Sequence, residues 1–169
     1  HDGLRIAPAT PNLAGANVEL VTVPRREHQL SDLLSEARHA YDYIVIDCPP
    51  SLGLLTVNSL VAADELLIPV QAEYYALEGL SQLIETINLV KTHVKPELEI
   101  LGAVITMFDK RTRLSVEVMN ELYKYFPDRI FRSVIPRTVR LAEAPSFGQS
   151  IAQYEPHGKG ARAYERLAR

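Results

Sequence analysis

Apolar residues gather in this chain in short, nearly continuous runs, and they rarely alternate with polar residues. Such runs are typical of strands that are buried on both faces of a parallel sheet. They predict four strands, which cover Tyr43–Ile46, Glu65–Val70, Leu98–Met107 and Ile130–Ile135. Leu4–Ala7 is a further candidate.

Helical periodicity fills the intervals between these runs. It is clearest over Leu77–Val94, where leucine, isoleucine and valine recur every three or four residues. The same spacing predicts helices over Gln29–His39, Leu54–Ala63, Ser115–Tyr125 and Ala161–Leu167. Pro8–Asn17 has the composition of a loop. Strands that alternate with helices in this way predict an α/β fold with a mostly parallel, doubly wound sheet. Because no internal boundary is visible, residues 1–169 are expected to form a single domain.

Composition narrows the classes of protein that fit this fold. The 169 residues are 47% hydrophobic and 23% charged, which is ordinary for a globular domain. The one cysteine, Cys48, excludes a disulfide framework and disfavours an iron–sulfur carrier. No apolar run is long enough for a membrane span, so a cytoplasmic location is expected. The net charge of −3 hides a basic segment, because residues 110–140 carry eight Lys and Arg against three Asp and Glu.

One apolar run ends abruptly in a carboxylate and two prolines, in the sequence YDYIVIDCPPS. Asp47 therefore lies at the carboxyl end of a predicted strand, where open α/β sheets bind their ligands. A carboxylate there can hold a water of hydrated Mg²⁺. Pro49 and Pro50 force the chain to leave the sheet as a stiff loop. On these residues alone, an aspartate that merely caps the next turn or helix is an equally good interpretation.

Two further predicted strands end in a similar way. Thr106–Asp109 closes one of them and Ile135–Arg137 closes the next, with Pro136 at its centre. Polar or conformationally restricted residues thus follow three of the four predicted strands, and this arrangement predicts a nucleotide at that edge of the sheet. Taken singly, each end is equally well explained by a strand that runs into a polar loop.

Five segments in order carry a resemblance to a known family: YDYIVIDCPPSLGLLTVNSL, ADELLIPVQAEYYALEGL, TMFDKRTRLS, IPRTVRLAEAPSFGQSI and GARAYERLA. Together they resemble the ParA/Soj chromosome-partitioning ATPases, over nearly the whole chain. The first segment alone also fits the wider deviant Walker A group, which includes MinD. The resemblance implies a P-loop NTPase-like fold and an ATPase that uses ATP and Mg²⁺. It also implies an ATP-bound homodimer that binds nonspecific DNA at the nucleoid, does not bind membranes, and is stimulated by a ParB partner.

The resemblance also implies roles for individual residues. Asp47 matches the Walker B aspartate, which holds magnesium through water and couples it to a switch loop over residues 48–51. Met107 and Asp109 match positions on the base side of the nucleotide. Pro136 matches a proline beside the adenine, and Thr138 stands where this family usually has asparagine.

DNA binding by the same resemblance falls on Arg111 and Arg140. The basic segment adds Lys110, Arg113 and Arg137 as candidates. Such side chains neutralise backbone phosphates without reading the base sequence. The other interpretation of these cations is a solvated surface that is paired with acidic residues elsewhere.

A phosphate loop of the form G-x-x-x-x-G-K-S/T is not found in the sequence, and HGKGAR at 157–162 has the wrong order. The chain is therefore expected to correspond to the C-terminal two-thirds of a ParA-type ATPase domain, with a sheet that is incomplete at its N-terminal side. Two expectations follow: the chain alone does not hydrolyse ATP, and it folds only marginally. The alternatives are a MinD-like division-site ATPase that binds the membrane, and a loop-less relic that binds DNA or a partner.

Overall fold

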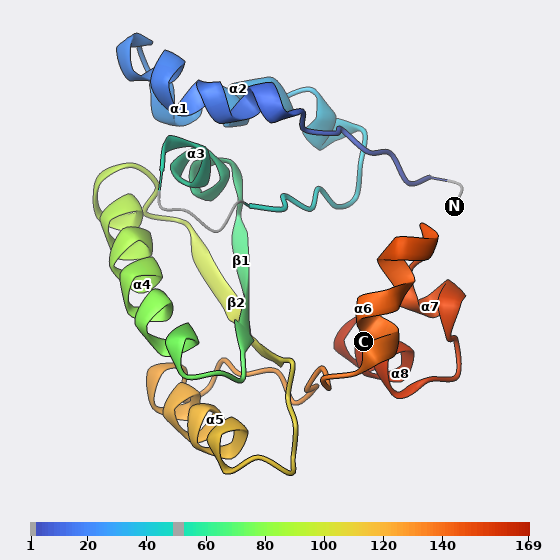
Figure 1. Cartoon of the computed structure of the whole chain (residues 1–169). Helices are drawn as coiled ribbons and strands as arrows, with labels where there is room; N and C mark the ends of the chain where they lie inside the picture. The colour runs from blue at the N-terminus through green and yellow to red at the C-terminus, as the bar shows by residue number, and fades with distance from the viewer. Residues whose placement is uncertain (1–2, 49–52) are drawn as a thin grey trace. The chain divides into compact units, whose positions relative to one another are not determined.

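The computed structural model describes residues 3–48 and 53–169 and divides the chain into two compact units (Figure 1). The first unit comprises the residues up to Asp64 together with Thr86–Leu98. The second comprises Glu65–Glu85 and Glu99–Arg169. The single domain expected over residues 1–169 stays a prediction.

Short helices make up most of the first unit. They are a 3-10 turn over Pro11–Gly15, α1 over Ala16–Glu19, 3-10 turns over Leu20–Thr22 and Arg26–His28, α2 over Gln29–Leu34, a 3-10 turn over Ala37–His39, and α3 over Leu54–Ala62. The helix predicted over Gln29–His39 is therefore interrupted after Leu34. The loop predicted over Pro8–Asn17 is wrong in part, because a 3-10 turn begins at Pro11, where proline is tolerated in a first helical turn.

A buried asparagine joins α3 to the helical segments before it. Asn58 is only 3% exposed. Its Oδ1 accepts a hydrogen bond of 3.1 Å from the backbone N–H of Leu30. Its Nδ2 donates to the carbonyl oxygens of Arg26, at 2.8 Å, and of Leu54, at 2.9 Å. Asn58 thus satisfies its own polar atoms and fixes the position of α2 against α3.

The C-terminal end of α3 is closed by two cations. The Lys95 Nζ donates to the carbonyl oxygens of Val61, at 3.1 Å, and of Ala63, at 2.5 Å. Arg38 pairs with Asp64 at 2.8 Å and also donates to the carbonyl oxygen of Ala62. The arginine hydrogen bond lowers the pKa of Asp64. Cations at this position satisfy the last carbonyl groups of the helix and complement its dipole.

The strand predicted over Tyr43–Ile46 is wrong, because no regular element forms there. Tyr43 is 89% exposed and Val45 is 92% exposed. A strand exists only through its ladder of hydrogen bonds to a neighbour, and these residues have none within the described parts of the chain. The candidate strand Leu4–Ala7 is absent for the same reason.

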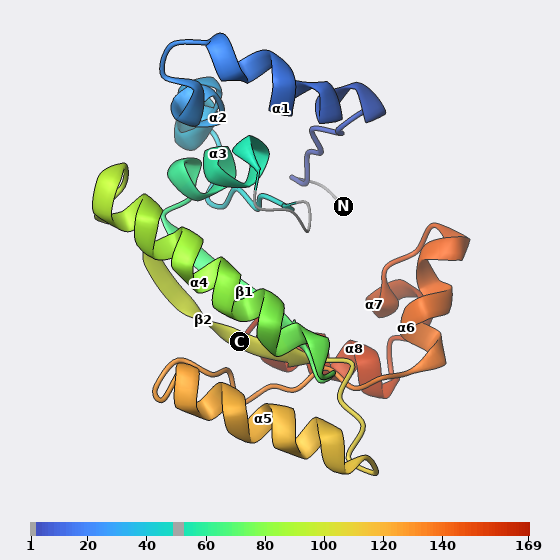
Figure 2. The ribbon, with the colours of Figure 1, turned by 60° about the vertical axis from the view of Figure 1, so that its left-hand side comes forward.

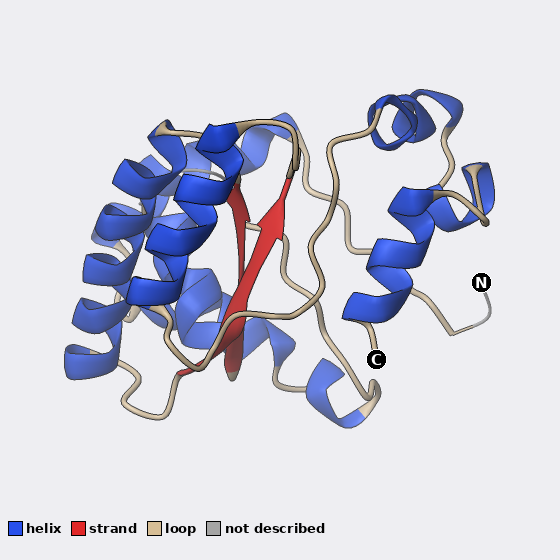
Figure 3. Ribbon diagram, turned by 90° about the horizontal axis from the view of Figure 1, so that it is seen from below, coloured by secondary structure: helices blue, strands red, loops and turns tan. Residues whose placement is uncertain are grey.

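Two parallel strands form the sheet of the second unit: β1 over Glu65–Gln71 and β2 over Glu99–Thr106 (Figure 3). Both were predicted from their apolar runs. The segment predicted as a strand over Ile130–Ile135 also runs parallel beside β2 and is hydrogen-bonded to it, but its pairing consists of isolated bridges at Ile130 and Pro136 rather than a regular ladder. The predicted α/β class with a parallel sheet is therefore confirmed, and the third strand is confirmed only in part.

Gly102 explains how this third segment comes so close to β2. A Cβ atom at Gly102 would lie 2.8 Å from the carbonyl oxygen of Arg129 and 2.9 Å from the ring of Phe131. The neighbouring Ala103 N–H donates to that same Arg129 oxygen at 2.7 Å. Any side chain at residue 102 would push the segment away and break this bond.

The remaining helices are α4 over Tyr75–His93, α5 over Arg113–Tyr125, α6 over Val139–Glu143, α7 over Ile151–Tyr154 and α8 over Lys159–Leu167, with a 3-10 turn over Ala144–Phe147. Helix α4 runs along β1 (Figure 2). The helices α4, α5 and α8 were predicted, and each begins two residues earlier than expected. Within the described residues, no helix is long and apolar enough to span a membrane.

Helix α8 is fixed to the sheet by its small and apolar residues. Ala163 is fully buried against Val104 and Ile135, and Leu167 packs on the same cluster. Gly160, in the first turn of α8, lies close to α6 because it has no side chain. A Cβ atom there would lie 3.0 Å from Leu141. The helix therefore presents its polar residues in a fixed orientation.

Candidate functional site

Parallel pairing places the carboxyl ends of β2 and of the third segment at the same edge of the sheet. Just after β2, Phe108 pairs with the end of the third segment: its N–H donates to the carbonyl oxygen of Ile135 at 3.1 Å. The Phe108 carbonyl oxygen accepts from the N–H of Arg137 at 3.0 Å. Met107 and Asp109 flank Phe108, and Pro136 pairs with it. The structure thus brings together the residues that were predicted to lie on the base side of a nucleotide.

Met107 adopts a backbone conformation that is unusual for its residue type. Its φ is +52°, in the left-handed region that favours glycine. For a residue with a side chain this conformation costs roughly 1–2 kcal/mol. Residues held in this way gather at functional sites, where the surrounding structure fixes them. At Met107 it turns the chain sharply out of β2, so that Phe108 can pair with the third segment.

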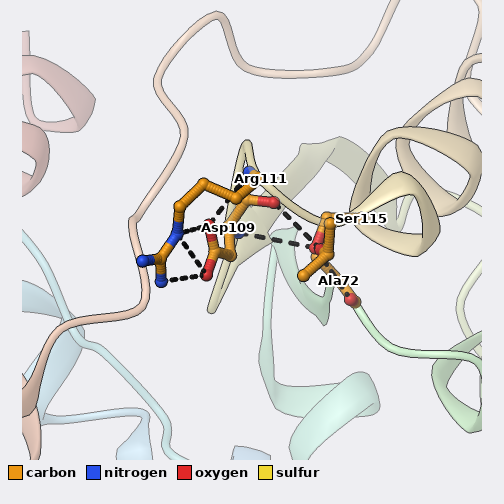
Figure 4. Close-up of polar contacts among 5 residues, drawn as sticks. Ala72, Asp109, Arg111 and Ser115 are labelled. Atoms are coloured by element: carbon orange, nitrogen blue, oxygen red, sulfur yellow. Dashed lines mark hydrogen bonds and ion pairs between the residues drawn. The ribbon is translucent and has the colours of Figure 1, made fainter.

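The Asp109 carboxylate is held by Arg111 (Figure 4). The Arg111 Nε donates to Oδ1 at 2.9 Å, and Nη2 donates to Oδ2 at 2.7 Å. The backbone N–H of Arg111 also donates to Oδ1, at 3.0 Å. These hydrogen bonds, with that from the arginine side chain the largest cause, lower the pKa of Asp109 to about 2. Asp109 is therefore an ionised acceptor at neutral pH.

A buried hydroxyl group links this loop to the end of β1 (Figure 4). Ser115 is 3% exposed. Its Oγ accepts from the Thr112 hydroxyl at 2.8 Å and from the Asp109 N–H at 3.4 Å. The same Oγ donates to the carbonyl oxygen of Ala72 at 3.4 Å. The loops that follow β1 and β2 are thus connected through one side chain.

Asp47 lies in the first unit, exposed and outside any regular element. Most of the predicted switch loop, residues 49–51, lies outside the described residues. Among the described residues, no group of three or more His, Cys, Asp or Glu side chains could hold a metal ion. A single carboxylate is compatible with Mg²⁺, since this ion takes one or two carboxylates and completes its shell with waters and phosphates. The role of Asp47 stays a prediction.

Most of the cations predicted to contact DNA are ion-paired. Arg111 binds Asp109, as described above, and Arg113 pairs with Glu117 at 2.8 Å. Lys110 forms no ion pair with a described residue. These side chains are largely exposed, and such surface pairs contribute little to stability and exchange readily. The pairs of Arg111 and Arg113 follow from short sequence spacings and could have been predicted.

Arg137 and Arg140 also have carboxylate partners. Arg137 pairs with Glu73, which lies 64 residues away in the sequence, so no local pattern could have predicted the contact. Arg140 pairs with Glu143 at 3.0 Å and with Glu155 at 3.8 Å. The contact with Glu143 raises the pKa of Arg140, so that its guanidinium stays charged.

Thr138 is the N-cap residue of α6. Its Oγ1 accepts a hydrogen bond of 3.2 Å from the N–H of Leu141 and so caps the N-terminus of α6. A threonine cap of this kind is worth about 1 kcal/mol. The contact with a nucleotide that was considered for this position stays a prediction.

A hollow beside α8 was missed by the sequence analysis. Its volume is about 340 Å³, and it is lined by Phe108, Val134, Pro136, Lys159, Arg162 and Arg166. The three cations are spaced three and four residues apart, so the sequence could have predicted that they share one face of a helix. The apolar residues of the hollow come from the strand-end edge, and only the tertiary structure places them there.

Comparisons with known proteins identify relatives of this chain. A model of the AAA domain family matches residues 1–100. The sporulation initiation inhibitor protein Soj of Bacillus subtilis is 52% identical over 168 residues, which are 99% of this chain and 66% of that protein. The chromosome partitioning protein ParA of Myxococcus xanthus is 52% identical over 166 residues, which are 98% of this chain and 59% of that protein.

Among solved structures, cobyrinic acid a,c-diamide synthase from Mycobacterium smegmatis with bound ADP and magnesium superimposes with a TM-score of 0.79. It is 35% identical, and the match covers 95% of this chain and 58% of that one. The chain thus spans 66% or less of the length of these relatives.

Proposed function

The chain belongs to the AAA domain family and, within it, to the Soj/ParA chromosome-partitioning ATPases, and from this premise we propose that it forms part of an ATP-dependent DNA-partitioning switch. In this proposal it supplies the base side of a nucleotide site and a surface for nonspecific DNA. We place the protein in the cytoplasm, at the nucleoid.

The observation that carries the nucleotide part is the strand-end edge around Phe108. Met107 and Pro136 offer apolar contacts to the faces of a base, since the backbone pairing of Phe108 with Pro136 holds them close together. Asp109 is an ionised acceptor, so it suits the amino group of adenine rather than a phosphate. Ordered residues at a strand end are what a binding site requires, because they need no rearrangement when the ligand arrives.

ATP would be the substrate that supplies the phosphoryl group, and Mg²⁺, when bound, would neutralise the charge on the phosphates. Asp47 would hold a water of the magnesium shell. Phosphates also require a cradle of backbone N–H groups and a lysine. This sequence contains no such loop, so we expect the 169-residue chain alone to show no ATP hydrolysis.

ATP turnover tests this part of the proposal. The 169-residue chain is assayed beside the product of the whole reading frame that encodes it, each with and without Asp47→Ala. We expect turnover only in the whole product and its loss in the Asp47→Ala variant. Turnover by the 169-residue chain that Asp47→Ala abolishes would contradict the proposal.

DNA binding, a ParB-type partner and an ATP-bound homodimer complete the proposed switch. Cosedimentation of the whole product with DNA or with anionic vesicles separates this function from a membrane-binding, MinD-like function. We expect binding to DNA that requires ATP and weakens with salt. Binding to vesicles and not to DNA would favour the MinD-like alternative. A ParB-type protein from the same genome is expected to raise the rate of ATP turnover.

A further inference from the structure

Arg111 fills the acceptor sites of the Asp109 carboxylate. A carboxylate offers about four such sites, two on each oxygen. Oδ1 accepts from the backbone N–H of Arg111 at 3.0 Å and from its Nε at 2.9 Å. Oδ2 accepts from Nη2 at 2.7 Å and shares Nε at 3.2 Å. A base amino group that is to donate to Asp109 must therefore displace a donor of Arg111.

The guanidinium is the part of Arg111 that can be displaced. The loop backbone is fixed, because the Asp109 N–H donates to the buried Ser115 Oγ at 3.4 Å and the Asp109 carbonyl oxygen accepts from the Thr112 hydroxyl at 3.0 Å. The Arg111 side chain, in contrast, is 83% exposed, while that of Asp109 is 19% exposed (Figure 4). The guanidinium can therefore turn into water while the backbone N–H of Arg111 keeps its bond to Oδ1. Exposed ion pairs of this kind are weak enough to be exchanged.

Asp109 requires a new donor when the guanidinium leaves. Its side chain is largely buried, and a buried charged group left without hydrogen bonds is costly. The hydrogen bond from the Arg111 side chain is the largest cause that lowers the pKa of Asp109, which shows how much the carboxylate depends on it. The amino group of adenine is a donor that can replace the guanidinium. A base without an amino group cannot replace it.

We propose that Arg111 competes with the nucleotide base for Asp109 and thereby sets how strongly the site prefers a base that carries an amino group. This inference rests on the proposed nucleotide-binding function and adds an internal competitor to it. A base with the amino group opens the ion pair between Arg111 and Asp109. A base without it leaves the ion pair closed and gains no contact with the carboxylate. Occupation of the base site thus changes the position of one surface cation.

Equilibrium binding of two nucleotides to the whole reading-frame product, with Mg²⁺, tests the competition. One nucleotide is ATP and the other is purine riboside triphosphate, which differs only by the absence of the amino group. The readout is the ratio of their two dissociation constants, because a change in overall charge affects both nucleotides alike. In Arg111→Ala the competitor is gone, so the preference for ATP should grow about two- to fivefold, which is the range that one exposed ion pair spans.

Two variants control this measurement. Arg25 also pairs with an aspartate, Asp32, at 3.2 Å, and its side chain is 68% exposed. Arg25→Ala therefore removes a comparable cation from the first unit, and the ratio should not change. In Asp109→Ala the preference for ATP should fall, and adding Arg111→Ala should change it no further, because the competition requires the carboxylate. Circular dichroism confirms that each variant is folded.

A second readout follows the guanidinium itself. The Arg111 Nε–H donates to both oxygens of Asp109, so its proton should exchange slowly with water in the nucleotide-free protein. Saturation with ATP should accelerate this exchange, as followed by NMR of the Nε–H signal. Saturation with purine riboside triphosphate should leave the exchange rate unchanged.

The outcomes separate the inference from the proposed function. A larger preference for ATP in Arg111→Ala, together with faster Nε–H exchange in the presence of ATP, supports the inference. An unchanged ratio in Arg111→Ala would overturn it and leave the partitioning function intact. An effect of Arg111→Ala that persists in the Asp109→Ala background would also overturn it, because Arg111 would then act on the nucleotide directly. If the unsubstituted product bound neither nucleotide, the proposed function would fail as well.

Discussion

Replacement of Asn58 by leucine tests whether a buried amide holds the first unit together. Leucine has nearly the same size and shape, so the substitution removes hydrogen bonds and leaves no large cavity. The N–H of Leu30 and the carbonyl oxygen of Arg26 lose their partners. The carbonyl oxygen of Leu54 loses one of its two hydrogen bonds, because it keeps the one within the helix.

The expected loss of stability follows from these two groups. A buried polar group left without a partner costs about 1–3 kcal/mol. Leu30 and Arg26 are both half-buried, so water can reach them in part and the lower end of that range applies. We therefore expect Asn58→Leu to lower the free energy of unfolding by about 2–4 kcal/mol. That is a large part of the total for a domain of this size.

Urea unfolding followed by circular dichroism measures this loss. With a slope of about 2 kcal/mol per molar urea, the midpoint should fall by about 1–2 M. Asn120→Leu is the matched control, because Asn120 is exposed on α5 and its replacement should change stability by less than about 0.5 kcal/mol. Equal midpoints for Asn58→Leu and Asn120→Leu would refute the reasoning.

Two further predictions concern the second unit. Because the pKa of Asp109 is lowered to about 2, its ionised form contributes stability above the unfolded pKa, and that contribution is lost as the pH falls from about 4 to 2. An NMR titration of the carboxylate should give a value near 2, rising toward the ordinary value in Arg111→Ala; a value near 4 in the unsubstituted chain would contradict the geometry. Gly102→Val should separate the third segment from β2, because a Cβ atom would lie 2.8 Å from the Arg129 oxygen. Hydrogen exchange should then show loss of protection at the Ala103 amide, and unchanged protection would show that the segment adjusts.

The apolar pattern of the sequence correctly predicted those elements whose own residues form a continuous apolar run or an apolar helical face. β1, β2 and the long helix α4 were predicted for that reason. The helix starts were missed by two residues because the first turns, such as Lys159–Gly160, carry no apolar periodicity. Boundaries of this kind depend on capping and on tertiary contacts.

The failures lie where a segment depends on a partner elsewhere. Tyr43–Ile46 has the composition of a buried strand, but a strand forms only when a neighbour supplies its ladder. The pairing of Arg137 with Glu73 could not be predicted because it joins residues 64 positions apart. The base-side residues were located by their place at strand ends, while the left-handed turn at Met107 carries no sequence signal.

The hydroxyl group of Ser115 has a mechanical consequence. Because the loops after β1 and β2 share this one oxygen, neither can be displaced without disturbing the other. Residues 72 and 109–115 should therefore open as a single cooperative unit in exchange experiments. The end of β1 and the Asp109 loop are thus coupled through one buried side chain, although they lie in different strands' loops.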